Sequence, residues 1–153
     1  MLKALIRWGL VAGVVVLLAI QLVPYGRRHT NPPVRQEPSW DSPRTRELVI
    51  RACYDCHSNQ TGWLWYTNIA PASWLIQNDV DEGRRKLNYS EWDLHQKDAR
   101  KAADKVEVGK MPPIYYAVFH RKAWLADGER AELIRGLAGT FGRRVLGSRG
   151  KYE

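Results

Sequence analysis

The apolar residues are concentrated at the amino terminus. Trp8 to Tyr25 is an 18-residue stretch without a charged side chain, and Lys3 and Arg7 precede it. At about 1.5 Å per residue, a helix of this length spans roughly 27 Å, close to the thickness of the hydrocarbon layer of a bilayer. Trp8 and Tyr25 at its ends suit the two membrane interfaces. We therefore expect residues 1–25 to anchor the chain in a membrane.

A cleaved signal peptide is the alternative interpretation of this segment. Its most apolar part, Leu10 to Ile20, is short enough for the hydrophobic region of a signal peptide. However, no small residues at cleavage spacing follow it, and Gln21 to Tyr25 is a poor cleavage site. The pattern favours an uncleaved anchor. Basic residues flank the segment on both sides, so charge does not determine its orientation.

After the apolar segment, the pattern changes to a polar spacer and then to helical stripes. Residues 26–41 contain three prolines among polar residues, which predicts an extended spacer with a solvated His29. Ser42 and Pro43 are a suitable N-cap and first helical residue. We therefore expect a helix from residue 43 into Cys53.

The same periodicity predicts three further helices, over residues 71–85, 91–108 and 127–139. The second would use Ser90 as its N-cap and the last would end at a glycine. No segment has an evident partner strand. We therefore predict an all-α domain over residues 42–142, followed by a frayed basic tail over residues 143–153.

The most informative stretch is Cys53-Tyr54-Asp55-Cys56-His57. Two thiols three residues apart on a helical turn project from the same side of the backbone, where both can reach the vinyl groups of one haem. His57 lies four residues after Cys53, so its imidazole faces the same side. The chain has two cysteines, and both are in this motif. We predict one haem c, attached covalently to Cys53 and Cys56, with His57 as the proximal iron ligand.

Three other uses of a cysteine pair stay open at this point. A thioredoxin-like dithiol needs strands on both sides of the motif, whereas here a helix is expected before it and a tryptophan-rich loop after it. A structural zinc site needs four ligands, and His95 and His120 are widely scattered. A disulfide across two residues would close a very small ring.

A second informative stretch, Gly109-Lys110-Met111-Pro112-Pro113, contains the only methionine beyond the initiator. A thioether is a soft ligand that suits haem iron, and the adjacent prolines restrict the backbone that presents it. We predict Met111 as the distal iron ligand. The alternatives are His120, His95 or water as the sixth ligand, with Met111 as an ordinary core residue.

The aromatic composition predicts a pocket with an apolar interior and a polar edge. The chain has seven tryptophans and seven tyrosines but two phenylalanines. The imidazole nitrogen of His57 that does not face the iron is expected to donate to a carbonyl in the Asn68–Pro71 segment. Five residues are assigned to the haem pocket: Trp63, Trp65, Tyr66, Trp74 and Pro112.

The net charge of +8, from 24 basic and 16 acidic residues, restricts the partners less than the motif does. Such an excess suits an acidic partner or an anionic membrane surface. We exclude nucleic acid as the expected partner, because no binding motif is present and the basic clusters lie in the glycine-rich tail.

Several ordered blocks resemble the small haem-binding domain of membrane-anchored bacterial c-type cytochromes. The resemblance covers about residues 42–140 and implies an all-α domain with haem on Cys53 and Cys56, His57 proximal and Met111 distal. One departure is Ala126, where similar sequences begin a helix with Ser-Asp. The matching blocks are Cys-Tyr-Asp-Cys-His-Ser-Asn (53–59), Trp63-x-Trp65-Tyr66, Ile69-Ala70-Pro71-x-Ser73-Trp74, Leu87-Asn88-Tyr89-Ser90-Glu91-Trp92 and Met111-Pro112-Pro113.

The resemblance implies no defined physiological activity. We expect one-electron transfer to or from a redox partner protein, with no enzymatic activity, because His/Met ligation leaves no open iron position. Thioether attachment takes place outside the bacterial cytoplasmic membrane, so the domain is expected on the periplasmic side. The alternatives are a haem-based sensor or peroxidase-like enzyme with an exchangeable sixth ligand, for which His120-Arg121 is the candidate pair, and a docking subunit with a structural haem.

Overall fold

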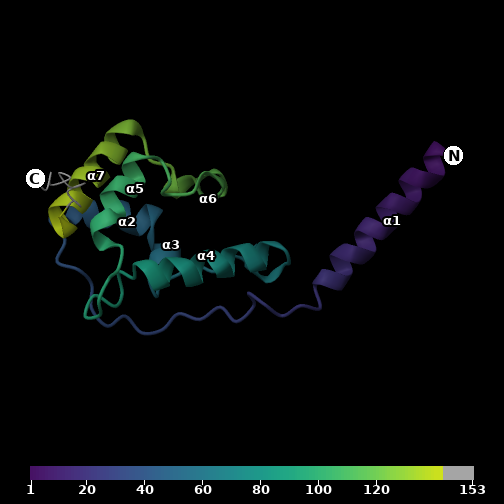
Figure 1. Cartoon of the computed structure of the whole chain (residues 1–153), viewed down its shortest axis with the longest axis horizontal. Helices are drawn as coiled ribbons and strands as arrows, with labels where there is room; N and C mark the ends of the chain where they lie inside the picture. Colours follow the sequence, from purple (N-terminus) through teal and green to yellow (C-terminus); the bar gives the residue numbers. More distant parts are fainter. Residues whose placement is uncertain (143–153) are drawn as a thin grey trace, which may run out of the picture.

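The computed structural model describes residues 1–142, and within them it contains helices and no β-strand (Figure 1). The prediction of an all-α domain is therefore confirmed. The predicted basic tail, residues 143–153, lies outside the described residues. The elements are α1 (Leu2–Ile20), α2 (Pro43–Ala52), α3 (Tyr54–His57), η1 (Trp65–Asn68), α4 (Ala72–Lys86), η2 (Ala99–Lys101), α5 (Ala102–Glu107), α6 (Ile114–Phe119), η3 (Arg121–Ala123) and α7 (Asp127–Phe141), where η denotes a 3₁₀ helix.

Helix α2 begins as the sequence predicts. The hydroxyl of Ser42 accepts a hydrogen bond from the amide of Thr45 at 3.2 Å, and Pro43 occupies the first turn, where a missing N–H costs nothing. Leu48, Val49 and Thr45 are buried on one side of the helix. The helix therefore enters the domain core and delivers the chain to Cys53.

The core lies where α2, α5 and α7 pack together (Figure 1). Leu48, Val106 and Leu133 are essentially inaccessible to solvent in this region. The contact between α2 and α7 requires Gly136, because a Cβ atom there would lie 1.9 Å from the hydroxyl oxygen of Thr45. Close packing of these helices forms one wall of the site described below.

The predicted helix over residues 91–108 is wrong at its beginning. Residues 90–98 form turns, and helical structure starts at Ala99 and continues as α5. Ser90 does not cap a helix, because its hydroxyl accepts the amide of Asn59 at 2.9 Å in the interior. Asp93, three residues after Ser90, forms an ion pair with Arg35.

Helix α4 lies within one residue of its predicted bounds. Apolar Leu75 is 50% exposed, whereas Ser73, Val80 and Gly83 are buried. The reason is the short distance between α4 and α3. A Cβ atom at Gly83 would lie 2.2 Å from the carbonyl oxygen of Cys56, so α3 packs against the small residues of α4.

Residues 26–41, which we call the strap, are extended but lie against the domain (Figure 1). The amides of Arg35 and Gln36 both donate to the carbonyl of Ser90, at 2.8 and 3.2 Å. His29 stacks on Trp63 with 4.4 Å between ring centroids and 9° between planes, so the expectation of a solvated His29 is wrong. The strap thus holds a defined course over the domain surface.

Helix α1 stands away from the domain and has no buried residue (Figure 1). It is long and apolar enough to cross a membrane, although a signal sequence has the same properties. Its end is attached to the domain, because the side-chain amide of Gln21 donates to the carbonyl of Ala70 at 2.9 Å and accepts from its amide at 3.0 Å. Gly26, at φ +80°, packs so closely on Ser73 that a side chain there would collide with its carbonyl.

Helix α7 begins at the predicted residue, Asp127, and ends later than the predicted residue 139. Ala126 provides no side-chain cap, but the carboxylate of Glu129 accepts its backbone amide at 3.1 Å. The helix continues through Gly139 to Phe141, and Gly142 at φ +72° ends it. A glycine is favoured there because other residues rarely adopt a positive φ.

Candidate functional site

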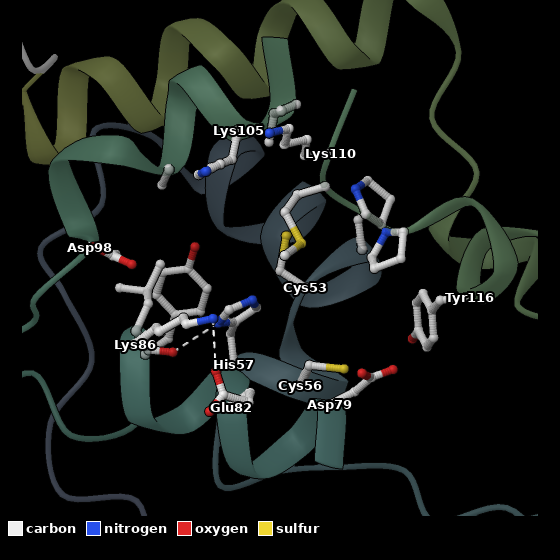
Figure 2. Close-up of a pocket in the computed structure, with 18 of the residues that line it drawn as sticks. Cys53, Cys56, His57, Asp79, Glu82, Lys86, Asp98, Lys105, Lys110 and Tyr116 are labelled. Carbon is white, nitrogen blue, oxygen red and sulfur yellow. Dashed lines mark hydrogen bonds and ion pairs between the residues drawn. The ribbon is translucent and has the colours of Figure 1, made fainter. Parts of the chain in front are cut away.

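A cavity of about 690 Å³ opens between α3, α4, α5 and the loop before α6, and we call it the thiol cavity (Figure 2). Its size falls within the range of small-molecule and cofactor sites. It brings together residues from both informative stretches of the sequence. The predicted site residues that line it are Cys53, Cys56, His57, Met111 and Pro112.

The motif lies on a single helical turn. Cys53 ends α2 and precedes α3, and the amide of His57 donates to the carbonyl of Cys53 at 2.9 Å. This i to i+4 hydrogen bond puts Cys53, Cys56 and His57 on one side of the backbone. Tyr54 points the other way, is 4% exposed and stacks on Tyr89 in the core. One turn therefore presents two sulfur atoms and an imidazole to the cavity while anchoring itself in the core.

The imidazole of His57 is held by the carboxyl-terminal end of α4. Its Nδ1 lies 2.9 Å from the carbonyl oxygen of Leu87 and 3.1 Å from that of Gly83. Both partners are acceptors, so Nδ1 carries the hydrogen and the lone pair is on Nε2, the nitrogen available to a metal. Burial lowers the pKa of His57, which keeps the ring neutral, as metal binding requires.

The expected acceptor for His57 was a carbonyl of the Asn68–Pro71 segment, and that prediction is wrong. The segment lies before the opposite end of α4, and both backbone polar groups of Ala70 are occupied by Gln21. The last carbonyls of a helix have no partner within the helix, which makes the end of α4 a suitable acceptor. A backbone carbonyl does accept a hydrogen bond from His57, as predicted, but this carbonyl belongs to another segment.

The two thiols do not resemble a redox-active pair. Both cysteines are free, and burial raises the pKa of Cys53 to about 12. Reactive dithiols instead have a lowered pKa that favours the thiolate. Within residues 1–142, no group of three or more His, Cys, Asp or Glu side chains is arranged to hold a metal ion. Neither the dithiol nor the zinc interpretation gains support from this geometry.

Met111 reaches the cavity from a loop that α5 supports. The amides of Lys110 and Met111 both donate to the carbonyl of Lys105, at 2.9 and 3.1 Å. Gly109, at φ +69°, allows the turn that these bonds require. Met111 is partly buried and packs against the core. The loop therefore presents a thioether to the same cavity as His57.

Four aromatic residues expected in the pocket do not line the thiol cavity, and this part of the prediction needs correction. Trp63 stacks on His29 of the strap and donates to Asn31 at 3.1 Å. Trp74 packs elsewhere on α4, with a buried indole N–H that has no partner. Trp65 and Tyr66 line a second cavity. Nearness to the motif in sequence misled the assignment, because the chain still bonds α3 at Gly62 but then leads to the strap and to the second cavity.

The apolar part of the thiol cavity comes from residues that the sequence analysis did not assign to the site. Two of them, Leu87 and Tyr89, belong to a block quoted above, but nothing in the sequence placed them beside the motif. These lining residues are Leu87, Tyr89, Val106, Tyr115, Tyr116 and Leu137.

The second cavity, of about 460 Å³, lies between η1, α4 and α6, and we call it the aromatic cavity. It includes His120, one of the alternative sixth ligands. The Nδ1 of His120 donates to the carbonyl of Tyr116 at 2.9 Å, and its Nε2 accepts the hydroxyl of Tyr66 at 2.7 Å. His95, another alternative, is exposed and lines neither cavity. Neither histidine faces His57 across the thiol cavity.

With this geometry in view, the comparison with known families is decisive. A family model described as a haem-binding domain matches residues 15–139. The chain belongs to this haem-binding domain family. No curated protein and no solved structure matches the chain. The family match begins within α1 and covers the strap, both cavities and most of α7.

The residues of the thiol cavity suit the haem that the family binds. An imidazole with a free Nε2 and a thioether are ligands that haem iron prefers, and His57 and Met111 supply them on one cavity. Leu87, Val106 and Tyr89 provide apolar walls for the macrocycle. Bound haem would supply a redox-active iron, and the protein supplies its ligands, orientation and dielectric environment.

The charges at the cavity edge also suit a haem, whose propionates are anionic. Lys86 pairs with Glu82 at 2.7 Å, but Lys105 and Lys110 form no ion pair within residues 1–142. Figure 2 shows both of these side chains opposite α4, the helix that carries Glu82 and Lys86. Two ammonium groups are thus available at the edge of the thiol cavity, where they could pair with the propionate carboxylates of a haem.

Proposed function

We propose that the protein is a monohaem c-type cytochrome-like electron carrier. Thioether bonds join the haem to Cys53 and Cys56, His57 is the proximal iron ligand and Met111 the distal one. The observation that carries this proposal is the meeting of Met111 with the Cys53–His57 turn in one cavity. A protein that binds haem without a covalent bond needs no pair of thiols beside the ligand histidine.

Ligation by histidine and methionine supports electron transfer over catalysis. With His57 and Met111 as ligands, a bound haem would have no open position on its iron and would keep the same ligands when reduced or oxidised. Peroxide chemistry gains no support from His120-Arg121, because His120 lines the aromatic cavity instead of the thiol cavity. The carrier exchanges electrons with a redox partner protein and needs no substrate-binding position on the iron.

A retained amino-terminal anchor completes the proposal. A cleaved signal peptide is discarded before the mature protein works, yet Gln21 bonds both backbone groups of Ala70, and Gly26 packs on Ser73. Cleavage between Gln21 and Gly26 would remove the first contact and leave Gly26 close to a free chain end. The anchor therefore holds the domain at a membrane, on the periplasmic side where thioether attachment takes place.

The test is to produce the full chain in a host that attaches haem c and to measure its intact mass under denaturing conditions. The expected result is a gain of one haem that is lost in the Cys53→Ser, Cys56→Ser double variant. The oxidised protein should show a weak near-infrared band from methionine ligation, and Met111→Ala should abolish it. A chain without covalent haem, or a near-infrared band unaffected by Met111→Ala, would contradict the proposal.

A further inference from the structure

The aromatic cavity is a second site that the haem does not use. Neither His57 nor Met111 lines it, so the iron belongs to the thiol cavity. The walls of the aromatic cavity are almost entirely carbon, and its volume of about 460 Å³ is large enough for a small organic molecule. The apolar residues that form most of the wall are Trp65, Leu75, Ile76, Val80 and Phe119.

The two cavities share one wall. Cys56, Asp79, Tyr115 and Tyr116 line both of them. Figure 2 shows Cys56, Asp79 and Tyr116 close together on one side of the thiol cavity. A molecule in the aromatic cavity would therefore be separated from a haem on Cys56 by a single layer of side chains.

A few polar groups are placed among the apolar walls. The hydroxyl of Tyr116 donates to Asp55 at 2.5 Å, and that of Tyr115 donates to Asp79 at 2.7 Å. The Nε2 of His120 accepts from Tyr66. The two carboxylates keep further lone pairs and can accept a hydrogen bond, and then a proton, from a hydroxyl group in the cavity. The hydroxyl of Tyr66 can accept another and pass its own proton to His120. An acyl chain would use none of them.

The cavity lies at the end of the domain that α1 holds. Gln21, the residue after α1, is bonded to Ala70 between η1 and α4, and both elements form walls of the cavity. Figure 1 shows α6 and the amino-terminal end of α4 on the side of the domain nearest α1. Trp65 and Phe119 at the cavity are 76% and 80% exposed. Large exposed apolar side chains beside a membrane anchor suit contact with lipid.

We propose that the aromatic cavity binds the ring of a lipid-soluble quinol, which donates electrons to the haem. This proposal rests on the proposed function, because it assigns the membrane donor of the same electron carrier. A quinol combines the required properties: a flat ring for an aromatic pocket, hydroxyl groups for acceptors, and an apolar tail that keeps it in the membrane next to α1.

The reaction balances with ferric haem as the oxidant. Complete oxidation of one quinol to the quinone removes two electrons and breaks two O–H bonds. Each electron reduces one ferric haem to ferrous haem, so one quinol reduces two haem-loaded chains. The two protons pass to His120, to Asp55 or to water. Reoxidation of the haem by the partner protein then returns the chain to its starting state.

The test uses the haem-loaded full chain in lipid nanodiscs with decylubiquinol as the donor, and it follows the absorbance of ferrous haem. The variant Phe119→Ala removes a cavity wall, and Val118→Ala on the same helix is the control, because Val118 is 58% exposed and lines neither cavity. Leu75→Trp fills the cavity, and Leu94→Trp is its control for the same reasons. Both cavity variants should slow reduction by about tenfold or more, and both controls should match the wild type.

Two further measurements separate the possible outcomes. Ascorbate, which needs no cavity, should reduce the haem of all variants at the same rate. Equilibrium binding of oxidised decylubiquinone, followed by quenching of tryptophan fluorescence, should weaken in Phe119→Ala and Leu75→Trp. Equal quinol reduction in cavity and control variants would overturn the quinol site and leave electron transfer standing. A haem that neither donor reduces, in a chain that still binds the quinone, would overturn the proposed function alone.

Discussion

The two cavities share a wall, yet they are built in opposite ways. In the thiol cavity, three of the groups proposed to bind the haem come from one helical turn, Cys53 to His57, and charged side chains lie at its edge. The aromatic cavity takes its apolar walls from η1, α4 and α6 and has no local motif. Reactive groups that must keep a fixed mutual geometry lie on one rigid turn, whereas an apolar volume can be assembled from distant parts of the chain.

The two histidines provide the strongest test of this division. We expect His57→Ala to abolish the low-spin absorption spectrum of the haem-loaded chain, because the iron loses its proximal ligand. His120→Ala should leave that spectrum unchanged, since His120 lines the aromatic cavity. Absorption spectra of the oxidised and reduced forms measure both effects. A spectrum altered by His120→Ala and not by His57→Ala would reverse the assignment of the two cavities.

Two glycines test how tightly each cavity is packed. A Cβ at Gly83, behind the motif, would lie 2.2 Å from the backbone oxygen of Cys56, whereas at Gly62, beside the aromatic cavity, it would lie 3.3 Å from a side-chain oxygen of Asp55. We expect Gly83→Ala to lower the free energy of unfolding by about 1–3 kcal/mol, as overpacking does. Gly62→Ala should cost less, because a side chain moves more easily than backbone.

The measurement for both glycine variants is chemical denaturation followed by circular dichroism. Gly128→Ala is the matched control within a helix, since nothing lies within 4 Å of a Cβ there. It should not destabilise the protein, because alanine is the better helix former. Equal losses in Gly83→Ala and Gly62→Ala would show that the motif turn is no more rigidly held than the aromatic cavity.

Charges at the edge of the thiol cavity should have a smaller effect, on the reduction potential of the haem. We expect Lys105→Gln and Lys110→Gln each to lower the reduction potential, because a nearby positive charge favours the ferrous form, which carries one positive charge fewer. The effect should shrink as salt is added. Lys122→Gln, on η3 and away from the thiol cavity, is the control. Redox titration at two salt concentrations measures these shifts. Equal shifts of the reduction potential in all three variants would show that Lys105 and Lys110 do not act through their position at the cavity.

The smallest effect concerns α2 and α7, which support the thiol cavity only. Arg51, with help from the amide of Ala126, lowers the pKa of Glu129 from 4.5 to about 2. A carboxylate with a depressed folded pKa stabilises the fold above its unfolded pKa, and this contribution is lost as the pH falls from 4.5 through about 2. The difference in melting temperature between wild type and Glu129→Gln should therefore be present at about pH 6 and vanish near about pH 2. A constant difference would exclude the ion pair as its cause.

Comparison of the predicted and observed elements shows where local rules sufficed. Ser42 and Pro43 predicted the start of α2 correctly because capping depends on residues within one turn. Ser90 offered the same signal and failed, because its hydroxyl serves the amide of Asn59, which lies far away in sequence. A capping residue identifies a helix start only where no tertiary partner competes for its side chain.

The site follows the same distinction. The spacing of Cys53, Cys56 and His57 determines by itself that they share one face, because helical geometry relates residues three and four apart. The acceptor behind His57 was misplaced, since the bond to Gly83 spans 26 residues and depends on how α3 packs against α4. Trp63 and Trp65 were misassigned for the same reason: closeness in sequence does not say which way a loop turns.

The sequence by itself determined the chemistry of this protein: the thiol and imidazole groups of the motif, the apolar amino-terminal helix and the helical character of the domain. Only the tertiary structure decided that Met111 and His57 line one cavity, that the strap lies on the domain and that a second cavity adjoins the first. Bonding geometry within one turn is set by the backbone, which every helix shares. Contacts across many residues depend on how whole helices fit together, and small residues such as Gly83 and Gly136 decide that fit.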